Sequence, residues 1–399
     1  MDFALSEEQK RLQQRCLELA ADFATRSAEH DRDASHPIEN YARLRQEGFL
    51  ALTIPAALGG GGASFLNHTI AYEALGQGCP STALAFNMHA SVVMPILECP
   101  DISLATKRSI ADLVVHERKL IGGNFSEPGT TSLIGERGLT ARARRIDGGY
   151  SITGRKMFAS MLEAADYVII LAYPEDANTP FAGALLLVRP DAPGRSVDAN
   201  WNTLGMRATR SDSLILDDCR VPETALLFRT DDMRAFRHAY LNWFWGSYTA
   251  VYLGVAVAAY DELRRTMKSR QPPGIAQSLA YHPDVRRHVA ELSTDLEAAR
   301  LITYRSAWLR DTQGPTAEAT AAMYRAKYMV GEAVSRITRV ALTLGGAHGI
   351  FKGSRIEQLF RDGALAAIQP PPADFCLWHM GLYELGLDAG DIMPALRSS

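Results

Sequence analysis

The segment Gly122 to Ser132, with the sequence GGNFSEPGTTS, could bind a ligand that is rich in hydrogen-bond acceptors. Ser126 carries a hydroxyl group, and the backbone N–H groups that follow it can also donate at the edge where a strand turns into a loop. The same residues are equally compatible with a plain turn. Taken alone, the segment predicts either a binding site or a turn.

Four further segments could take part in the same chemistry, although each is weak evidence by itself. They are KMFAS at 156–160, LGMRATRSDS at 204–213, RQPPG at 270–274 and LGGAHG at 344–349.

The glycine run at 59–64 follows a helical segment, whereas a dinucleotide-binding loop follows a strand, so we predict a surface loop there. The sequence contains no P-loop, no G-x-S-x-G and no H-E-x-x-H, and its ten histidines are scattered. Hydrolase chemistry and metal sites therefore find no support.

The elements that must position these segments fall into three parts, which predict an α+β chain. The first part, 1–118, opens with the capping-box pair Ser6 and Gln9 and continues with helical apolar periodicity. The second part, 119–228, has short apolar runs between turn residues, which predicts a small antiparallel β domain. The third part, 229–399, predicts a four-helix bundle. Helices are expected at 39–52, 66–78, 83–98, 103–118, 232–269, 283–311, 315–344 and 354–366.

Composition narrows the possible partners and the compartment. The 42 Lys and Arg residues nearly balance the 45 Asp and Glu residues, which argues against nucleic acid and anionic membranes as main partners. Five cysteines, far apart and without a C-x-x-C pair, indicate neither a disulfide framework nor a thiolate zinc site. The first residues carry charges where a secretory signal needs an apolar core, and the longest apolar stretch, 249–260, is too short to span a bilayer. We expect a cytoplasmic protein without a membrane span.

Read in order, these segments resemble the acyl-CoA dehydrogenase family over essentially the whole chain. The motifs are D-F-x-L-S-E-E-Q at the start, G-F-L-x-x-x-I-P at 48–55, S-E-P-G at 126–129, K-M-F-A-S at 156–160, and L-G-M-R-A-T-R-S-D-S with D-D-C-R-V-P at 204–222. The resemblance implies an N-terminal all-α domain, a middle antiparallel β domain and a C-terminal four-helix domain. It also implies FAD as cofactor, an acyl thioester on CoA or a carrier protein as substrate, and an electron-accepting partner or O₂. A homo-oligomer, either a dimer or a tetramer, is the implied assembly.

The resemblance assigns one group of residues to the pyrimidine edge of the flavin. Phe125 and Ser126, with the backbone amides through Thr131 and Ser132, match the strand that holds this edge in the family. A hydroxyl group there stabilises the charge that appears when the flavin is reduced.

Other residues match positions around the rest of the cofactor. Phe158 and Ser160 match an aromatic residue and a hydroxyl that flank the isoalloxazine ring and reach its N5 side, with Phe in place of the usual Trp. Arg270 matches an arginine that reaches the FAD pyrophosphate of a neighbouring subunit. Gly345 and Gly346 match a turn that lets the backbone approach the cofactor closely.

The chain departs from the family at the catalytic base. The Glu that removes the substrate α-proton in relatives follows an R-D-A-like sequence, and the corresponding position after 361–363 is Pro370. Proline lacks both the carboxylate and the N–H group that polarises the thioester carbonyl. The alternative position on a C-terminal helix is Phe244. Asp374 is the nearest carboxylate in the altered loop, and it is either a relocated base or the cap of a helix at 375–385.

Three hypotheses about function follow from this departure. The chain is a dehydrogenase with a relocated base, a flavin-dependent monooxygenase or oxidase on the same fold, or a non-catalytic subunit that pairs with a catalytic homologue. The aromatic cluster Trp243, Phe244, Trp245 and Tyr248 either narrows the substrate pocket or forms a core stripe.

Overall fold

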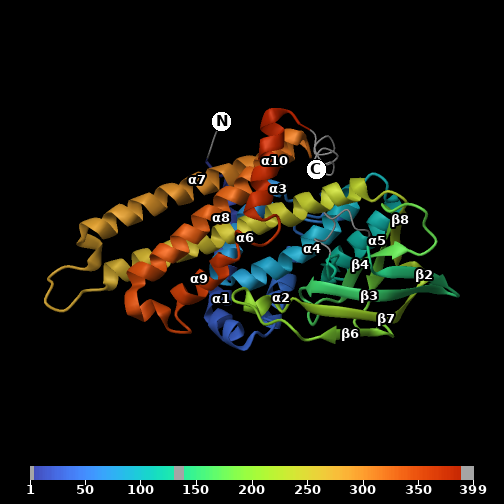
Figure 1. The fold of residues 1–399 in the computed structure, drawn as a ribbon, viewed down its shortest axis with the longest axis horizontal. Helices are drawn as coiled ribbons and strands as arrows, with labels where there is room; N and C mark the ends of the chain where they lie inside the picture. The colour runs from blue at the N-terminus through green and yellow to red at the C-terminus, as the bar shows by residue number, and fades with distance from the viewer. Residues whose placement is uncertain (1–3, 130–138, 388–399) are drawn as a thin grey trace, which may run out of the picture.

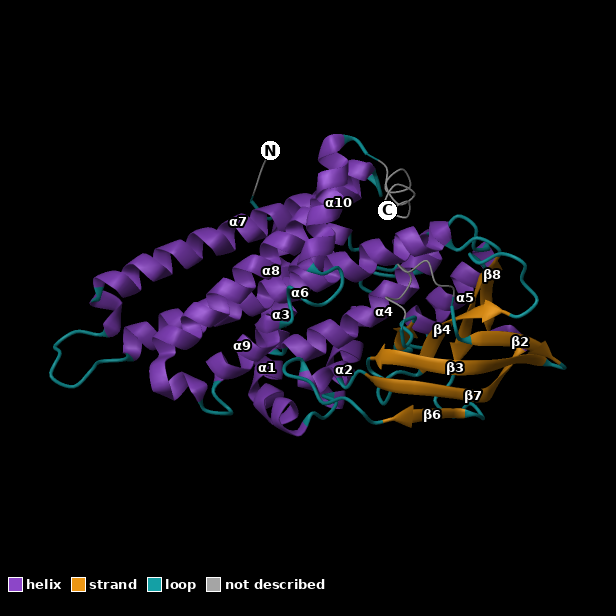
Figure 2. Ribbon diagram, in the orientation of Figure 1, coloured by secondary structure: helices purple, strands orange, loops and turns teal. Residues whose placement is uncertain are grey.

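The computed structural model describes residues 4–129 and 139–387, and its strands and helices occupy separate regions (Figure 2). The strands lie together at one end of the molecule, and helices from both ends of the sequence form the rest. The predicted α+β class, with its helical, β and helical parts in that order, is confirmed. Thr131 and Ser132, which were assigned to cofactor binding, lie outside the described residues.

The N-terminal helices form where apolar periodicity and helix caps coincide. Their bounds are α1 Glu7–Asp33, α2 Ile38–Gln46, α3 Phe65–Gly78, α4 Pro80–Glu98 and α5 Leu104–Val115. Ser6 and Gln9 form the predicted capping box at the start of α1, where each side chain accepts a hydrogen bond from the backbone N–H of the other. α4 is buried on almost every side, as expected of a central core helix.

The middle part is an eight-stranded sheet, as far as the described residues show. Its strands are β1 Ile121–Asn124, β2 Arg142–Ile146, β3 Gly149–Ala159, β4 Tyr167–Pro174, β5 Gly183–Val188, β6 Arg195–Asp198, β7 Asp212–Pro222 and β8 Leu226–Thr230. The strand order is β6-β7-β3-β2-β4-β5-β8, with β1 beside β4. The prediction of an antiparallel domain needs a correction, because β4 pairs in parallel with both β1 and β2. β1 lies directly on α4, since a Cβ atom at Gly123 would come within 1.9 Å of Val92 Cγ1.

The C-terminal part is a bundle of long helices. Their bounds are α6 Arg234–Ser269, α7 Pro283–Gln313, α8 Ala317–Gly345, α9 Arg355–Ala364 and α10 Ala373–Leu385. α6 packs against α3, α4 and α8, and its 36 residues make it ~54 Å long. Figure 1 shows α6 running from the sheet end of the molecule to the opposite end. Among the described residues, no helix is long and apolar enough to cross a membrane.

The three parts meet at a buried polar junction. Arg361 of α9 donates to Asp31 of α1 at 2.9 Å and to Glu357 at 2.6 Å. The next residue, Asp362, accepts a hydrogen bond of 2.6 Å from the backbone N–H of Met206, in the loop before β7. Burial, opposed by the Met206 N–H and reinforced by the charge of Asp31, raises the pKa of Asp362 to about 7. The junction therefore ties α1, the sheet domain and α9 together.

Candidate active site

Strand β3 carries a bulge at Phe158. Its pairing with β7 runs from Lys156 opposite Leu214 to Ala159 opposite Asp212, so β3 uses one more residue than β7 over this stretch. Phe158 has a φ of +58°, which is rare for a bulky residue, and it is 58% exposed. Bulges redirect side chains and are common beside active sites. The local backbone thus holds a flat aromatic ring in a partly exposed position, with Trp201 edge-on to it at a centroid distance of 6.3 Å.

Ser126 lies beside this bulge, because its carbonyl oxygen accepts a hydrogen bond of 3.0 Å from the backbone N–H of Met157. The preceding residue, Phe125, is buried against Tyr240 of α6, with ring centroids 4.7 Å apart. Phe125, Ser126 and Phe158 therefore converge where the sheet meets the first turns of α6.

A fully buried ion pair lies behind this corner. Lys156 Nζ donates to Glu127 Oε1 and to the carbonyl oxygen of Leu171, both at 2.5 Å. Glu127 also accepts from the backbone N–H and hydroxyl of Thr140, both at 2.5 Å, and from the N–H of Ala141 at 3.1 Å. Burial tends to raise the pKa of Glu127, but the Lys156 charge and the Thr140 donors hold that pKa below its usual value. Burial lowers the pKa of Lys156, although Glu127 opposes this effect.

Ser160 lies at one end of a chain of hydroxyl groups. Its Oγ is 2.7 Å from Ser211 Oγ, and Ser211 donates to Thr209 Oγ1 at 2.9 Å. Thr209 in turn donates to the carbonyl oxygen of Met206 at 2.9 Å. The predicted segments at 156–160 and 204–213 thus meet in the folded protein.

Arg270 lies with the predicted glycine turn, far from the groups above. One of its N–H groups donates to the carbonyl oxygen of Gly345 at 3.0 Å, and Gly346, with a φ of +64°, leaves room for the guanidinium. The rest of this guanidinium makes no hydrogen bond to the described residues. Tyr240 lies near the start of helix α6 and Arg270 caps its end (Figure 1). At about 1.5 Å per residue, the two residues are therefore ~45 Å apart along the helix axis. The structure therefore gathers the predicted cofactor residues into two groups at opposite ends of α6.

The altered loop exposes both Pro370 and Asp374. Asp374 is the second residue of α10, and the residue ahead of that helix, Pro372, provides no side-chain cap. The alternative interpretation of Asp374 as the helix cap is therefore wrong. No hydrogen bond or ion pair joins Asp374 to the rest of the described chain, so its carboxylate is available to solvent or a ligand.

The predicted aromatic cluster divides between different faces of α6. Phe244 is half-buried between Tyr240 and Tyr248, at centroid distances of 5.2 and 4.5 Å, and these three residues form a ladder that reaches Phe125 through Tyr240. Trp243 packs against α3, whereas Trp245 packs against α8 and α10. Burial raises the pKa of Tyr240 and Tyr248 above the ordinary tyrosine value, so these hydroxyls stay protonated. The ladder provides apolar contact surface and no proton acceptor of its own.

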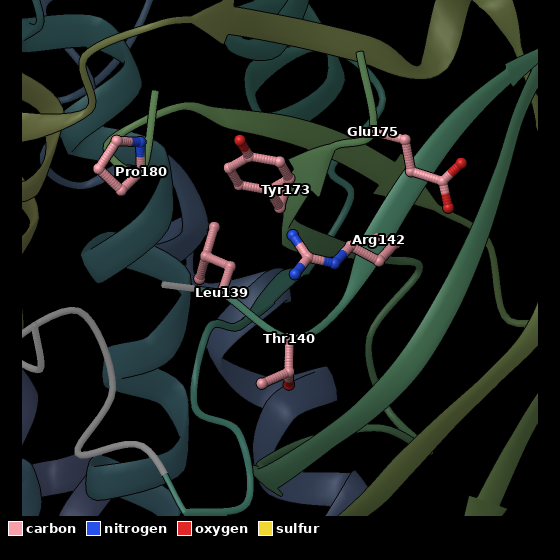
Figure 3. Close-up of a pocket in the computed structure, with 6 residues that line it drawn as sticks. All are labelled: Leu139, Thr140, Arg142, Tyr173, Glu175 and Pro180. Carbon is pink, nitrogen blue, oxygen red and sulfur yellow. The ribbon is translucent and has the colours of Figure 1, made fainter. Parts of the chain in front are cut away.

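An open hollow of about 490 Å³ lies on the sheet domain, next to the Glu127 ion pair (Figure 3). It is lined by Leu139, Thr140, Arg142, Tyr173, Glu175 and Pro180. The Arg142 guanidinium carbon lies 4.5 Å from the centre of the Tyr173 ring, a cation–π contact. Figure 3 shows Pro180 and Leu139 to the left of that ring and Arg142 to its lower right. The hollow thus offers a cation and a flat ring at one place.

Comparison with known proteins adds the family to this geometry. The acyl-CoA dehydrogenase N-terminal domain model matches residues 6–100, the middle domain model matches 124–219, and the C-terminal domain model matches 233–369. The three models follow one another in the family's order and together span most of the chain. The chain belongs to the acyl-CoA dehydrogenase family.

Curated relatives and solved structures agree with this membership. YdbM of Bacillus subtilis, named as an acyl-CoA dehydrogenase, is 28% identical over 381 residues, which are 94% of this chain and 97% of the relative. The mitochondrial short-chain specific acyl-CoA dehydrogenase of Rattus norvegicus is 26% identical over 368 residues, 91% of this chain and 87% of the relative. The butyryl-CoA dehydrogenase structure from Megasphaera elsdenii has the same fold, with a TM-score of 0.84, 22% identity, and coverage of 96% and 100% of the two chains. The relatives favour the dehydrogenase hypothesis over the two alternatives.

This acyl-CoA dehydrogenase family member is a flavoprotein oxidoreductase whose cofactor is FAD, as predicted. The residues present fit such a group: Phe158 offers a flat exposed ring, Ser126 and Ser160 offer hydroxyls beside it, and Arg270 offers unused donors for a phosphate. Within the described residues, no group of three His, Cys, Asp or Glu side chains is arranged to hold a metal.

Sequence reasoning missed several residues of the site in this family member. Lys156 was part of a quoted motif but had no assigned role, and its partner Glu127 follows Ser126 directly. Thr209 and Ser211 were likewise quoted without a role, and Tyr240 was not singled out. The signal available in the sequence was a lysine inside a predicted strand. If such a lysine is buried, it requires a partner of opposite charge.

Proposed function

We propose that this chain is an FAD-dependent acyl-thioester oxidoreductase that removes hydrogen from the α and β carbons of its substrate. The observation that carries the proposal is the convergence of Phe158 on its β-bulge with Ser126, Ser160 and the Tyr240 side of α6. Phe125 packs against Tyr240, the Ser126 backbone bonds to the strand beside Phe158, and Ser160 follows two residues later, so these segments meet between the sheet and the bundle. We call this region the flavin corner, and its position suits a flat cofactor with a substrate beside it. When bound there, FAD supplies the hydride acceptor.

The chain's own residues divide the remaining work. Phe158 covers a ring face, and Ser126 offers a hydroxyl to the polar edge of the cofactor. The ladder of Tyr240, Phe244 and Tyr248 offers an apolar wall for the acyl chain and excludes water from it.

We assign Asp374 as the proton acceptor. The family's usual base positions hold Pro370 and Phe244, and neither side chain can accept a proton. Asp374 is exposed and makes no hydrogen bond or ion pair within the described chain, four residues beyond Pro370. Its helix α10 packs through Phe375 against Trp245 of α6, the helix that also carries Phe244 on another face.

We further propose that the enzyme works as a homo-oligomer. The corner at Phe158 and the cluster at Arg270 lie ~45 Å apart along α6, further than one FAD molecule reaches. If both groups hold FAD, each cofactor must take its ring contacts from one subunit and its phosphate contacts from another. This arrangement agrees with the implied role of Arg270 toward a neighbouring subunit.

The hollow at Arg142 supports CoA rather than a carrier protein as the thioester carrier. Arg142 and Tyr173 offer a cation for a phosphate and a ring for a base, and Thr140 links the hollow to Glu127 beside the flavin corner.

All five cysteines are buried and unpaired in the described chain, which supports a reducing, cytoplasmic setting.

Anaerobic titration with saturated acyl-CoA tests this proposal. The purified protein should bind FAD, and its flavin absorbance should bleach when the substrate is added. Asp374→Asn should slow the bleaching by about 10²-fold or more, the contribution of a general base. The matched control is Asp284→Asn, because Asp284 is also an exposed carboxylate in the first turn of a helix, α7. Rapid bleaching of Asp374→Asn would reject the assignment of the base, and a protein that cannot take up FAD would reject the whole proposal.

The electron acceptor is tested in the same series. Turnover in air without added acceptor would indicate O₂, whereas turnover only with an artificial electron acceptor would indicate a protein partner.

A further inference from the structure

The hydroxyl chain at Ser160 has a fixed direction. The carbonyl oxygen of Met206 can only accept, so the single proton of the Thr209 hydroxyl is used in that bond. Thr209 Oγ1 must then accept from Ser211, which uses the Ser211 proton. Because Ser211 has no further proton, the contact of 2.7 Å between Ser160 and Ser211 requires Ser160 to donate.

The same count of hydroxyl protons determines which hydrogen bonds Ser160 can make with a ligand. Its one proton points toward Ser211, so only oxygen lone pairs remain on its other side. Ser160, Ser211 and Thr209 are 9%, 7% and 2% exposed, which leaves little room for water to supply a different partner. Reversing the chain would leave the Met206 carbonyl without the Thr209 proton.

The end of the chain is held firmly in place. The backbone N–H of Met206 donates to Asp362 at 2.6 Å, and its carbonyl also accepts from the Trp201 indole N–H at 3.3 Å. The backbone N–H of Thr209 donates to the same carbonyl at 3.1 Å. The position of the acceptor at the end of the hydroxyl chain is therefore fixed by the junction between the sheet domain and α9.

We infer that Thr209 and Ser211 are positioning residues that orient the Ser160 hydroxyl as a hydrogen-bond acceptor, so that the site prefers the flavin form that carries a proton on N5. This inference rests on the proposed function and on the family resemblance, which implies that Ser160 reaches the N5 side of the flavin. Oxidised flavin presents a lone pair at N5, whereas two-electron-reduced flavin presents an N–H group. An acceptor at Ser160 therefore favours the reduced cofactor and raises its midpoint potential.

The midpoint potential of the FAD-loaded protein tests the inference. Thr209→Val removes the hydroxyl that fixes the direction of the chain, so Ser160 becomes free to donate to oxidised flavin. The preference for reduced over oxidised FAD should fall about tenfold, which is ~30 mV toward more negative values for a two-electron couple. Ser211→Ala should act in the same direction, and Thr209→Ser, which retains the hydroxyl, should keep the wild-type potential.

The matched control is Ser213→Ala, since Ser213 is a buried hydroxyl of β7 that contacts Arg155 and Asn200 outside this chain. It should leave the potential unchanged even if it lowers stability. An unchanged potential in both Thr209→Val and Ser211→Ala, or an equal shift in Ser213→Ala, would overturn the inference alone. Should Thr209→Val lose FAD, Ser211→Ala carries the test. A wild-type protein that takes up no FAD would instead overturn the proposed function, and the inference with it.

Discussion

The buried pair of Glu127 and Lys156 should be strongly coupled, and a double-mutant cycle can measure this coupling. Breaking a fully buried ion pair by removing one partner costs about 3–5 kcal/mol, because the other charge remains without compensation. Replacing both charges with neutral groups of similar volume is often neutral or even stabilising. The test variants are Glu127→Gln, Lys156→Met and the double variant.

The remaining contacts rank the two single variants. After Lys156→Met, the Glu127 carboxylate retains the two Thr140 donors and the Ala141 N–H, so the loss should lie near 3 kcal/mol. After Glu127→Gln, Lys156 retains the Leu171 carbonyl and at most one amide oxygen, so the loss should approach 5 kcal/mol. The double variant should lose about 1 kcal/mol or less.

Thermal unfolding of the apo protein, followed by circular dichroism, is the assay. A change of 1 kcal/mol shifts Tm by about 2–4 °C for a unit of 150–250 residues, so each single variant should melt roughly 6–20 °C below wild type. The exposed pair Arg145 and Glu223 is the control, and removing either partner should change Tm by no more than about 2 °C. A double variant as unstable as the sum of the single variants would refute the reasoning.

Three further predictions concern the cofactor, pH and packing. Arg270→Ala should weaken FAD binding about 10- to 100-fold, measured by equilibrium dialysis, because a charge-assisted contact to a phosphate is lost. Arg264→Ala, on the exposed face of α6, is the control and should not change the affinity. Equal FAD affinities of the two variants would contradict the phosphate role of Arg270. The folded-state pKa of Asp362, about 7, lies above its unfolded value, so the contribution of Asp362 to stability should fall by about 3 kcal/mol between pH 4 and 7. The Tm of the wild type should therefore decline relative to that of Asp362→Asn over this range, and parallel Tm profiles of the two proteins would contradict the prediction. Gly123→Ala should lower the free energy of unfolding in urea by about 1–3 kcal/mol, because the new Cβ atom would clash with the Val92 side chain. Adding Val92→Ala to the same chain should recover part of this loss. Additive losses from the two substitutions would argue against the clash.

The long helices could be predicted from the sequence almost to the residue. The segment predicted at 232–269 is α6, Arg234–Ser269, and the one at 283–311 is α7, Pro283–Gln313. Long apolar periodicity and tertiary burial agree in these helices. The strands β2 and β6 were not predicted, because their sequences, RARRI and RSVD, are mostly polar and exposed and show no apolar alternation.

The segments that meet at the proposed flavin corner could be related to one another only through resemblance to a family. The sequence spacing of Ser126 and Ser160 does not show that they are related. Their segments meet only in the folded protein, where the backbone N–H of Met157 donates to the Ser126 carbonyl oxygen. The contact between Ser160 and Ser211 spans 51 residues of sequence and depends on the pairing of β3 with β7. The left-handed backbone of Phe158 was equally hidden, because a bulge depends on the partner strand as much as on its own residues.

The length of α6 has a genetic consequence for the proposed assembly. In that proposed assembly, one end of this helix would serve the flavin corner of its own subunit, and the other end would present Arg270 to a cofactor held by another subunit. A subunit defective at Arg270 and a subunit defective at Ser126 would each be inactive as a pure oligomer. In a mixed dimer, however, one of the two sites would combine the intact corner of the first subunit with the intact arginine of the second. Two defective alleles should therefore complement each other when they are co-expressed, and equal expression with random pairing should restore about a quarter of the wild-type sites.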